Sequence, residues 1–179
     1  AFGQWISPVM FGEIRSDNAN AGGDPSNNDQ PGWQEFDDFT NTNTNLVVHP
    51  MYRRNYIGIN RANSLLALAR MESDLVDVYK AEAKFLRAYY HFELFRHFGP
   101  IPVITEPLTP EDVNLARNTL SEVMQQVVQD CQEAAATLPL IVPTGQEGRA
   151  TKGAALALMG KAYLYAVFLI PSLKALRHT

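Results

Sequence analysis

Hydrophobic and polar residues are distributed unevenly along this chain of 179 residues. Residues 2–15 are rich in apolar side chains and are predicted to be helical around Pro8. Residues 16–45 hold most of the asparagines, together with aspartates, glycines and prolines that favour turns over helices. We therefore predict a long irregular polar loop, 16–45, near the N-terminus. It contains Trp33, Phe36 and Phe39, so part of it is expected to pack against the body of the protein.

Four helices are predicted after the polar loop, because apolar positions recur at spacings of three and four residues. The first runs from about 50 to 71, and one of its faces carries Tyr52, Tyr56, Ile59, Asn63 and Leu66. The second runs from about 75 to 98 and carries apolar side chains on most of its faces. Gly99 supplies a left-handed position at its end, and Pro100 prevents continuation. Residues 101–105 then form the best candidate for a strand.

The third predicted helix is amphipathic. It begins at Thr119, where Thr119 and Glu122 have the spacing of a capping box. Its apolar stripe indicates one buried and one solvated side, and consists of Leu120, Met124, Val127, Cys131, Ala134 and Leu138. The fourth helix runs from about 151 to 169. Lys161 interrupts its apolar run, which favours a buried helix over a membrane span.

The second and fourth helices resemble each other. Arg87-Ala-Tyr89 aligns with Lys161-Ala-Tyr163 at an offset of 74 residues. This offset is close to the length of two tetratricopeptide units of about 34 residues each. Both helices are apolar on more than one side, as expected where a helix packs between neighbours. We predict an all-α fold of tetratricopeptide-like stacked helical pairs with Tyr89 and Tyr163 buried, a lone bundle being the alternative. The whole of 1–179 is expected to form one domain, with a helical-repeat body over 50–170.

Composition and charge exclude several classes of protein. The net charge of −4 provides no positive field for nucleic acid or anionic lipid. The single cysteine, Cys131, excludes an internal disulfide and a thiolate metal cluster, and its apolar stripe predicts a core thiol. The first residues lack the pattern of a signal peptide.

No catalytic or metal-binding motif stands out. The four histidines lack metal-ligand spacing, and HExxH, GxSxG and Gly-rich phosphate loops are absent from the sequence. Glu35, Asp37 and Asp38 lie in a predicted flexible loop, which does not hold two carboxylates at the separation that a glycosidase needs. Residues 17–22 resemble a calcium loop, but Ala19 and Ala21 occupy ligand positions. We predict no catalytic residue, no metal site and no cofactor.

Two groups of polar residues are candidates for binding. Arg15, Asp17, Asn18 and Trp33 have the chemistry of a ligand site for sugars, with a flat ring for stacking and polar groups for hydroxyls. Alternatively, Trp33 anchors the loop and Arg15 pairs with Asp17. Lys80, Lys84 and Arg87 form a basic stripe on one helical face. This stripe is either a docking face for an acidic partner or a solvated edge of a buried helix.

Several segments together resemble the SusD/RagB family of nutrient-binding surface lipoproteins. The sequence EAKFLRAYY, from Glu82 to Tyr90, is followed by Phe98-Gly-Pro-Ile-Pro102. The sequence RATKGAA begins at Arg149, ahead of a helix that reaches Tyr163-Leu-Tyr165. The family's earlier helix has counterparts in Tyr56, Asn60 and Asn63, and Ile14–Asn18 is similar to its stretch before a variable loop. The resemblance spans residues 5–165.

The resemblance implies an all-α, non-enzymatic protein that binds an oligosaccharide, such as a piece of a starch-like polysaccharide, or a peptide. It further implies delivery to a SusC-like TonB-dependent transporter, and a surface-exposed lipoprotein of the cell outer membrane. Membrane attachment would use only a lipid anchor absent from this chain. Family members are longer, so an interior fragment is expected, and 166–179 departs from the family pattern. A helical-repeat adaptor that binds proteins is the alternative.

Overall fold

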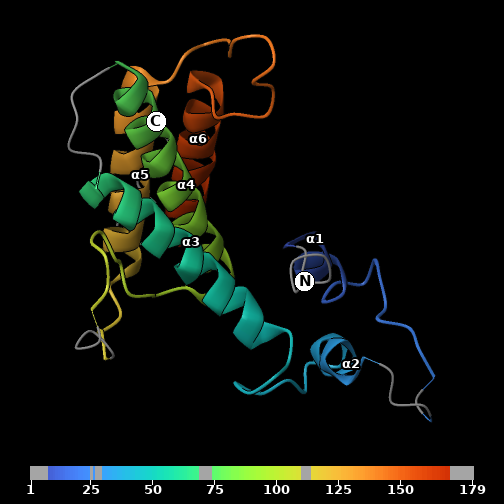
Figure 1. Ribbon diagram of the computed structural model, residues 1–179. Coiled ribbons are helices and arrows are strands. Elements are labelled where there is room, and N and C mark those ends of the chain that lie inside the picture. The colour runs from blue at the N-terminus through green and yellow to red at the C-terminus, as the bar shows by residue number, and fades with distance from the viewer. Residues whose placement is uncertain (1–7, 25, 27–29, 69–73, 110–113, 170–179) are drawn as a thin grey trace. The chain divides into compact units, whose positions relative to one another are not determined.

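The computed structural model describes residues 8–24, 26, 30–68, 74–109 and 114–169. These residues form six helices and no strand, so the prediction of an all-α fold is confirmed. The chain divides into two compact units, unit 1 (1–54) and unit 2 (55–179), which are described separately. A single domain over 1–179 stays a prediction. The helices are shown in Figure 1 and are α1 (Pro8–Glu13), α2 (Pro31–Asp37), α3 (Val48–Leu68), α4 (Asp74–Phe98), α5 (Leu120–Thr137) and α6 (Lys152–Leu169).

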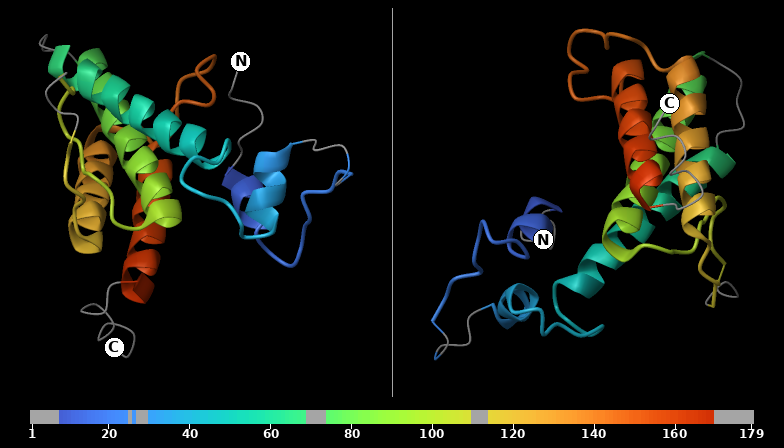
Figure 2. Two further views of the ribbon diagram at one scale, coloured as in Figure 1. Left: turned by 90° about the horizontal axis from the view of Figure 1, so that it is seen from below. Right: turned by 180° about the vertical axis from the view of Figure 1, so that it is seen from behind.

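Unit 2 is organised around α4. The views in Figures 1 and 2 agree that α3 crosses one side of α4 and that α5 and α6 lie on the other. On the α3 side, Gly58 lets the Tyr90 ring come so close that a methyl group would overlap it. On the α6 side, the rings of Phe92 and Tyr165 meet edge to face at 5.3 Å. Neighbours on both sides explain why the sequence of α4 is apolar around most of its girth.

Small side chains allow α4, α5 and α6 to approach closely. One cluster of buried residues joins the three helices and consists of Ala81, Ala134, Ala135, Leu138 and Ala155, with Phe85 packed against it. The helix α5 begins with the predicted capping box, because the Thr119 hydroxyl accepts the Glu122 N–H and the Glu122 carboxylate accepts the Thr119 N–H. The predicted burial of its apolar stripe is confirmed at Val127 and Cys131.

The prediction of a buried helix holds for only one side of α6. Its inner face, with Ala155 and Ala162, is buried, but its outer face exposes Leu164. Tyr163 is 48% exposed and Tyr89 of α4 is 37% exposed, so the predicted burial of both tyrosines is also wrong. The reason is that no described helix covers the outer side of α6 or this side of α4. Across the described helices, none combines the length and apolar character that crossing a bilayer requires.

The connection from α4 to α5 is extended but is not a strand. Gly99 adopts the predicted left-handed conformation, with φ 69°, and its N–H bonds to Phe95 O at 3.0 Å. Beyond it, one backbone bond, from Asn118 N to Ile101 O at 3.0 Å, and several side-chain bonds hold the segment. The Tyr56 hydroxyl donates to Pro102 O at 2.8 Å, and the Asn118 carboxamide oxygen accepts from Val103 N at 2.9 Å. Since buried backbone groups need partners, these bonds hold the segment without a β-ladder.

Unit 1 contains a helix inside the predicted irregular loop. Although residues 16–45 have a turn-like composition, α2 forms at Pro31–Asp37, with Pro31 at a position where helices tolerate proline. The amphipathic spacing of its aromatic residues explains it, because Trp33 and Phe36 are buried on one face beside Phe11. The Asn45 side chain then caps α3 by accepting the N–H groups of Val47 and Val48.

Candidate functional site

A polar pocket of unit 1 lies between residues 20–23 and the C-terminal part of α2. This loop pocket has a volume of about 220 Å³ and is lined by Asn20, Ala21, Gly22, Gly23, Gln34, Asp37 and Asp38. The carboxylate of Asp37 accepts the Ala21 N–H at 3.0 Å, which ties the loop to the helix. Gly22 and Gly23 have φ values of 66° and 92°, a conformation that glycine adopts without steric strain.

The lining of the loop pocket is suited to a neutral polar ligand. Its carboxylates and amides offer acceptors and donors side by side, as sugar hydroxyls require. Asp38 is exposed, and the Asn20 side chain turns back to accept the Gly22 N–H at 2.7 Å. Among the described residues, no cluster of three or more His, Cys, Asp or Glu side chains suits a metal ion.

Two of the four residues predicted to bind a ligand have structural contacts in unit 1. Trp33 is only 5% exposed, and its ring packs edge to face on Phe11 and Phe36 at 6.2 Å from each. Arg15 is half-buried and donates to the Asn41 carboxamide oxygen at 2.6 Å. Its guanidinium also lies 4.5 Å from the Phe36 ring centroid.

The other two predicted residues, Asp17 and Asn18, are exposed and precede the pocket in sequence. The Asn18 N–H bonds to the Ser16 hydroxyl at 3.2 Å, and neither residue lines the loop pocket. None of the four predicted residues lines the loop pocket, and their role in binding stays a prediction. The pocket residues that sequence reasoning missed, Asn20 and Gln34, carried no signal beyond their polarity.

The basic stripe of α4 is divided by the structure. Lys80 and Lys84 are half-buried at the surface, where Lys84 pairs with Glu133 of α5 at 2.5 Å and so lowers the pKa of that carboxyl group. Arg87 is only 7% exposed and lies inside unit 2. The hypothesis of a docking face stays a prediction, narrowed to Lys80 and Lys84, because a partner cannot reach Arg87.

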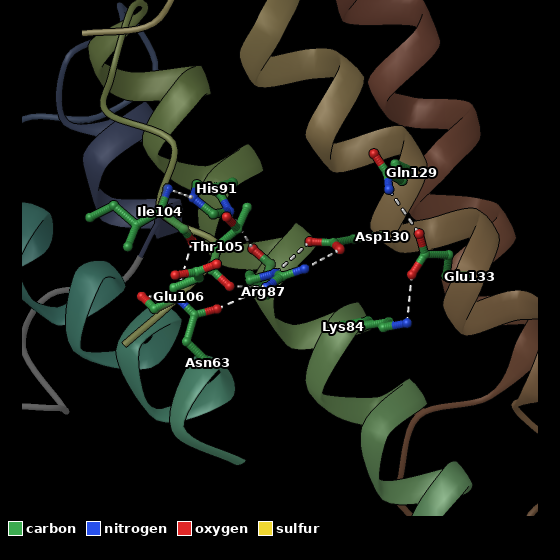
Figure 3. A network of polar contacts seen from close by, with 10 residues as sticks. All are labelled: Asn63, Lys84, Arg87, His91, Ile104, Thr105, Glu106, Gln129, Asp130 and Glu133. Carbon is green, nitrogen blue, oxygen red and sulfur yellow. Dashed lines mark hydrogen bonds and ion pairs between the residues drawn. The ribbon is translucent and has the colours of Figure 1, made fainter. Parts of the chain in front are cut away.

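Arg87 is the centre of a buried network that joins three helices and the extended connection (Figure 3). Its Nε and Nη2 donate to the two carboxylate oxygens of Asp130 on α5, at 2.8 and 2.7 Å. Its Nη1 donates to Asn63 Oδ1 on α3 and to Thr105 O, both at 2.9 Å. The Asn63 amide in turn donates to Ile104 O and Glu106 O. These bonds satisfy a charged pair that would otherwise be unfavourable to bury.

His91 completes the buried network one turn further along α4. Its Nε2 accepts the Ile104 N–H at 3.3 Å, and its Nδ1 lies 3.1 Å from Arg87 O, so the ring must be neutral with the proton on Nδ1. Burial, and then the positive charge of Arg87, lower the pKa of His91 to about 4. Burial and Asp130 raise the pKa of Cys131 to about 12, so this thiol stays protonated at neutral pH. Both groups are parts of the scaffold.

The segments that resemble a known family contact one another in unit 2. Glu82, at the start of EAKFLRAYY, forms a bidentate ion pair with Arg149 of RATKGAA, whose guanidinium also lies 4.9 Å from the Tyr79 ring. Arg87 of the first segment bonds Asn63 of the earlier helix. These residues therefore hold the helices of unit 2 in place.

Comparison with known proteins gives a consistent result. A SusD-like family model, described as starch-binding and associating with the outer membrane, matches residues 10–164. A laminarin-binding SusD-like protein of known structure is 39% identical, with a TM-score of 0.81 over 88% of this chain and 35% of its own. A SusD-like protein from Bacteroides fragilis is 25% identical, with a TM-score of 0.77 over 89% of this chain and 32% of its own.

A curated SusD-like protein from Formosa agariphila is 34% identical over 85 residues, which are 47% of this chain and 16% of that protein. The chain thus spans about a third or less of the length of these relatives. The family model nevertheless covers well over half of the present sequence. The tetratricopeptide-like packing of α3 to α6 agrees with the match. The chain belongs to the SusD-like family.

Proposed function

We propose that the protein of which this chain is part binds an oligosaccharide without catalysis and delivers it to a SusC-like TonB-dependent transporter. The observation that carries the proposal is the family match over residues 10–164, whose description names starch binding at the outer membrane. The identity of 39% to a laminarin-binding protein supports a glucan as the ligand. A surface-exposed lipoprotein of the cell outer membrane is the setting that this function requires.

The loop pocket is the place in unit 1 where we expect part of the glycan to bind. A sugar hydroxyl both donates and accepts hydrogen bonds, and the carboxylates, amides and glycine backbone of the pocket offer partners for both. Asp37 already accepts the Ala21 N–H, so it preorganises the site, whereas Asp38 is exposed and free to accept from a hydroxyl. Preorganised donors and acceptors raise affinity because less entropy is lost on binding.

Calorimetric titration of the full-length protein with laminarin, starch and a wider glycan panel tests the proposal. We expect binding of at least one glucan, and Asp38→Asn together with Gln34→Ala should weaken it about tenfold, which corresponds to about 1.4 kcal/mol. Asp24→Asn is the matched control, because Asp24 is an exposed carboxylate of the same loop that does not line the pocket. Absence of binding to every glycan would overturn the proposal.

Docking to the transporter is proposed to use Lys80 and Lys84 of α4, which remain at the surface of unit 2. Lys80→Glu with Lys84→Glu should reduce co-purification with the co-expressed transporter. Arg61→Glu is the control, because Arg61 is an exposed cation on α3. Equal co-purification of both variants would remove these lysines from the proposal.

A second candidate ligand is a peptide, and a groove between α5 and α6 favours it. The groove has a volume of about 480 Å³ and is lined by Ser121, Met124, Gln125, Val128, Gln129, Gln132, Tyr163 and Ala166. Glutamine amides match the donors and acceptors of a peptide backbone, and Tyr163 adds an exposed ring. Screening a defined peptide library, with Tyr163→Ala and Gln129→Ala as variants, tests this alternative. Binding that both substitutions leave unchanged would exclude the groove.

A further inference from the structure

Phe39 is an exposed aromatic residue held in an unusual backbone conformation. It follows Asp38, the C-cap of α2, has φ 59° and is 65% exposed. A bulky residue rarely adopts positive φ, and such strain persists only where surrounding contacts enforce it. Three contacts in unit 1 do so, and they fix where the ring points.

The first contact comes from Arg15, whose guanidinium lies 4.2 Å from the Phe39 ring centroid. The second holds Arg15 itself, since its Nη1 donates to the Asn41 oxygen at 2.6 Å. The third fixes the backbone that follows Phe39, because the N–H groups of Thr40 and Asn41 both donate to Glu35 O, at 2.9 and 3.1 Å. The ring therefore has a defined orientation, although it faces solvent.

Single exposed apolar side chains are common on protein surfaces and require no function. Leu46 of the same unit is an example, since it is 74% exposed. Phe39 differs because it has flat faces and because a cation covers one of them. Phe39 is 65% exposed, so most of the surface of this residue remains open to solvent. Of the three aromatic residues in the polar loop, it is the one whose ring is available, because Trp33 and Phe36 are buried.

We propose that Phe39 is a stacking platform for one pyranose ring of a bound glucan. The C–H face of a pyranose is apolar and flat, so it buries well against an aromatic ring. Phe39 is adjacent to Asp38 of the loop pocket, and consecutive Cα atoms are about 3.8 Å apart. If one sugar unit stacks on the Phe39 ring, the next sugar unit of the chain would lie near the polar groups of the loop pocket. Arg15 is then a positioning residue for the platform, and this inference rests on the proposed function.

The test is calorimetric titration of the full-length protein with laminarin oligosaccharides and, in parallel, maltooligosaccharides. Phe39→Ala and Phe39→Leu should each weaken binding about 3- to 10-fold, the range for loss of one aromatic contact. Phe39→Trp should bind within about 3-fold of wild type, because it restores a flat face. Leu46→Ala is the matched control and should leave affinity unchanged. Phe39→Leu keeps an apolar side chain, so it also serves if Phe39→Ala fails to fold.

The outcomes separate this inference from the proposed function. If wild type binds a glucan and Phe39→Leu binds equally well, the ring is not a platform and only this inference is overturned. Weakening by Phe39→Trp as large as by Phe39→Leu would also overturn it, since the flat face would then be irrelevant. If wild type binds neither oligosaccharide series, the glucan proposal and the platform are both overturned. Weakening by leucine with rescue by tryptophan supports the platform.

Discussion

Two arginines show how differently the two units use the same side chain. Arg87 in unit 2 is 7% exposed and makes four hydrogen bonds, which reach α3, α5 and the connection after α4. Arg15 in unit 1 is half-buried, makes one side-chain bond to Asn41 and lies against two aromatic rings. The first arginine joins distant elements, whereas the second supports one exposed ring.

This difference separates polar residues that hold the helices together from polar residues that remain open to a ligand. In the buried network, Arg87 bonds to both Asp130 and Asn63, so few of these polar groups remain for a ligand. In the polar loop, exposed groups such as Asp38 retain open positions. Segments with the family motifs therefore build a rigid body, and a loop with none of the strongest motifs carries the candidate site.

Substituting Arg87 should produce the largest effect. Arg87→Ala leaves the Asp130 carboxylate buried without a cation. The free energy of unfolding of unit 2 should therefore fall by about 3–5 kcal/mol. Urea denaturation followed by circular dichroism measures this loss. Lys84→Ala is the control, because its pair with Glu133 is partly exposed and should contribute at most about 1 kcal/mol. A loss from Arg87→Ala as small as that from Lys84→Ala would contradict the buried network as the centre of unit 2.

Acid should weaken unit 2 through His91. The folded pKa, about 4, lies below the unfolded value of 6.5, so the unfolded chain binds the proton first as pH falls. Stability is therefore fully present above about pH 6.5 and declines towards pH 4, by about 3 kcal/mol in total. Denaturation at several pH values measures the slope.

His91→Gln removes one titrating group, so it should lower stability at neutral pH and reduce the slope between pH 6.5 and 4. A smaller slope should remain, because burial also lowers the pKa of His97. His49→Gln, at an exposed position in unit 1, should keep the wild-type slope. An unchanged slope in His91→Gln would show that other groups govern the acid response.

Two glycine substitutions should distinguish a closely packed helix position, Gly58, from an open one, Gly160. Gly58→Ala places a methyl group on the Tyr90 ring, so the ring or the two helices must shift, at about 1–3 kcal/mol. Gly160→Ala on α6 meets no atom within 4 Å and should stabilise the helix by about 0.5–1 kcal/mol. Thermal denaturation of both variants measures the contrast. Equal effects would show that α3 and α4 are not in tight contact at Gly58.

The smallest effect is expected at Arg15. Arg15→Ala loses the hydrogen bond to Asn41 and the contacts with the buried Phe36 ring and the exposed Phe39 ring. It should destabilise unit 1 by about 1 kcal/mol. Tryptophan fluorescence reports this unit selectively, because both tryptophans, Trp5 and Trp33, fall within its sequence range. Asp17→Ala, at an exposed position, should change little. A loss as large as that of Arg87→Ala would remove the contrast between the two arginines.

Most helix positions could be predicted from local signals. The left-handed Gly99 and the capping box at Thr119 mark helix ends through bonds made within a few residues. The short helix α2 was missed because its surroundings have turn-like composition. Pro31 at its start and the spacing of Trp33 and Phe36 were the available signals. Its burial needed Phe11, which lies far away in sequence.

What the sequence alone determined is the all-α class, the end of α4 at Gly99, the start of α5 at Thr119 and the family resemblance. Tertiary structure decided which polar residues are buried. Lys84 and Arg87 belong to one helical stripe, yet only Arg87 is withdrawn from solvent, because Asp130 lies opposite it, 43 residues away. It also decided that Trp33 is covered and Phe39 is open. Periodicity is a local property of the chain, whereas desolvation depends on every element that packs around a side chain.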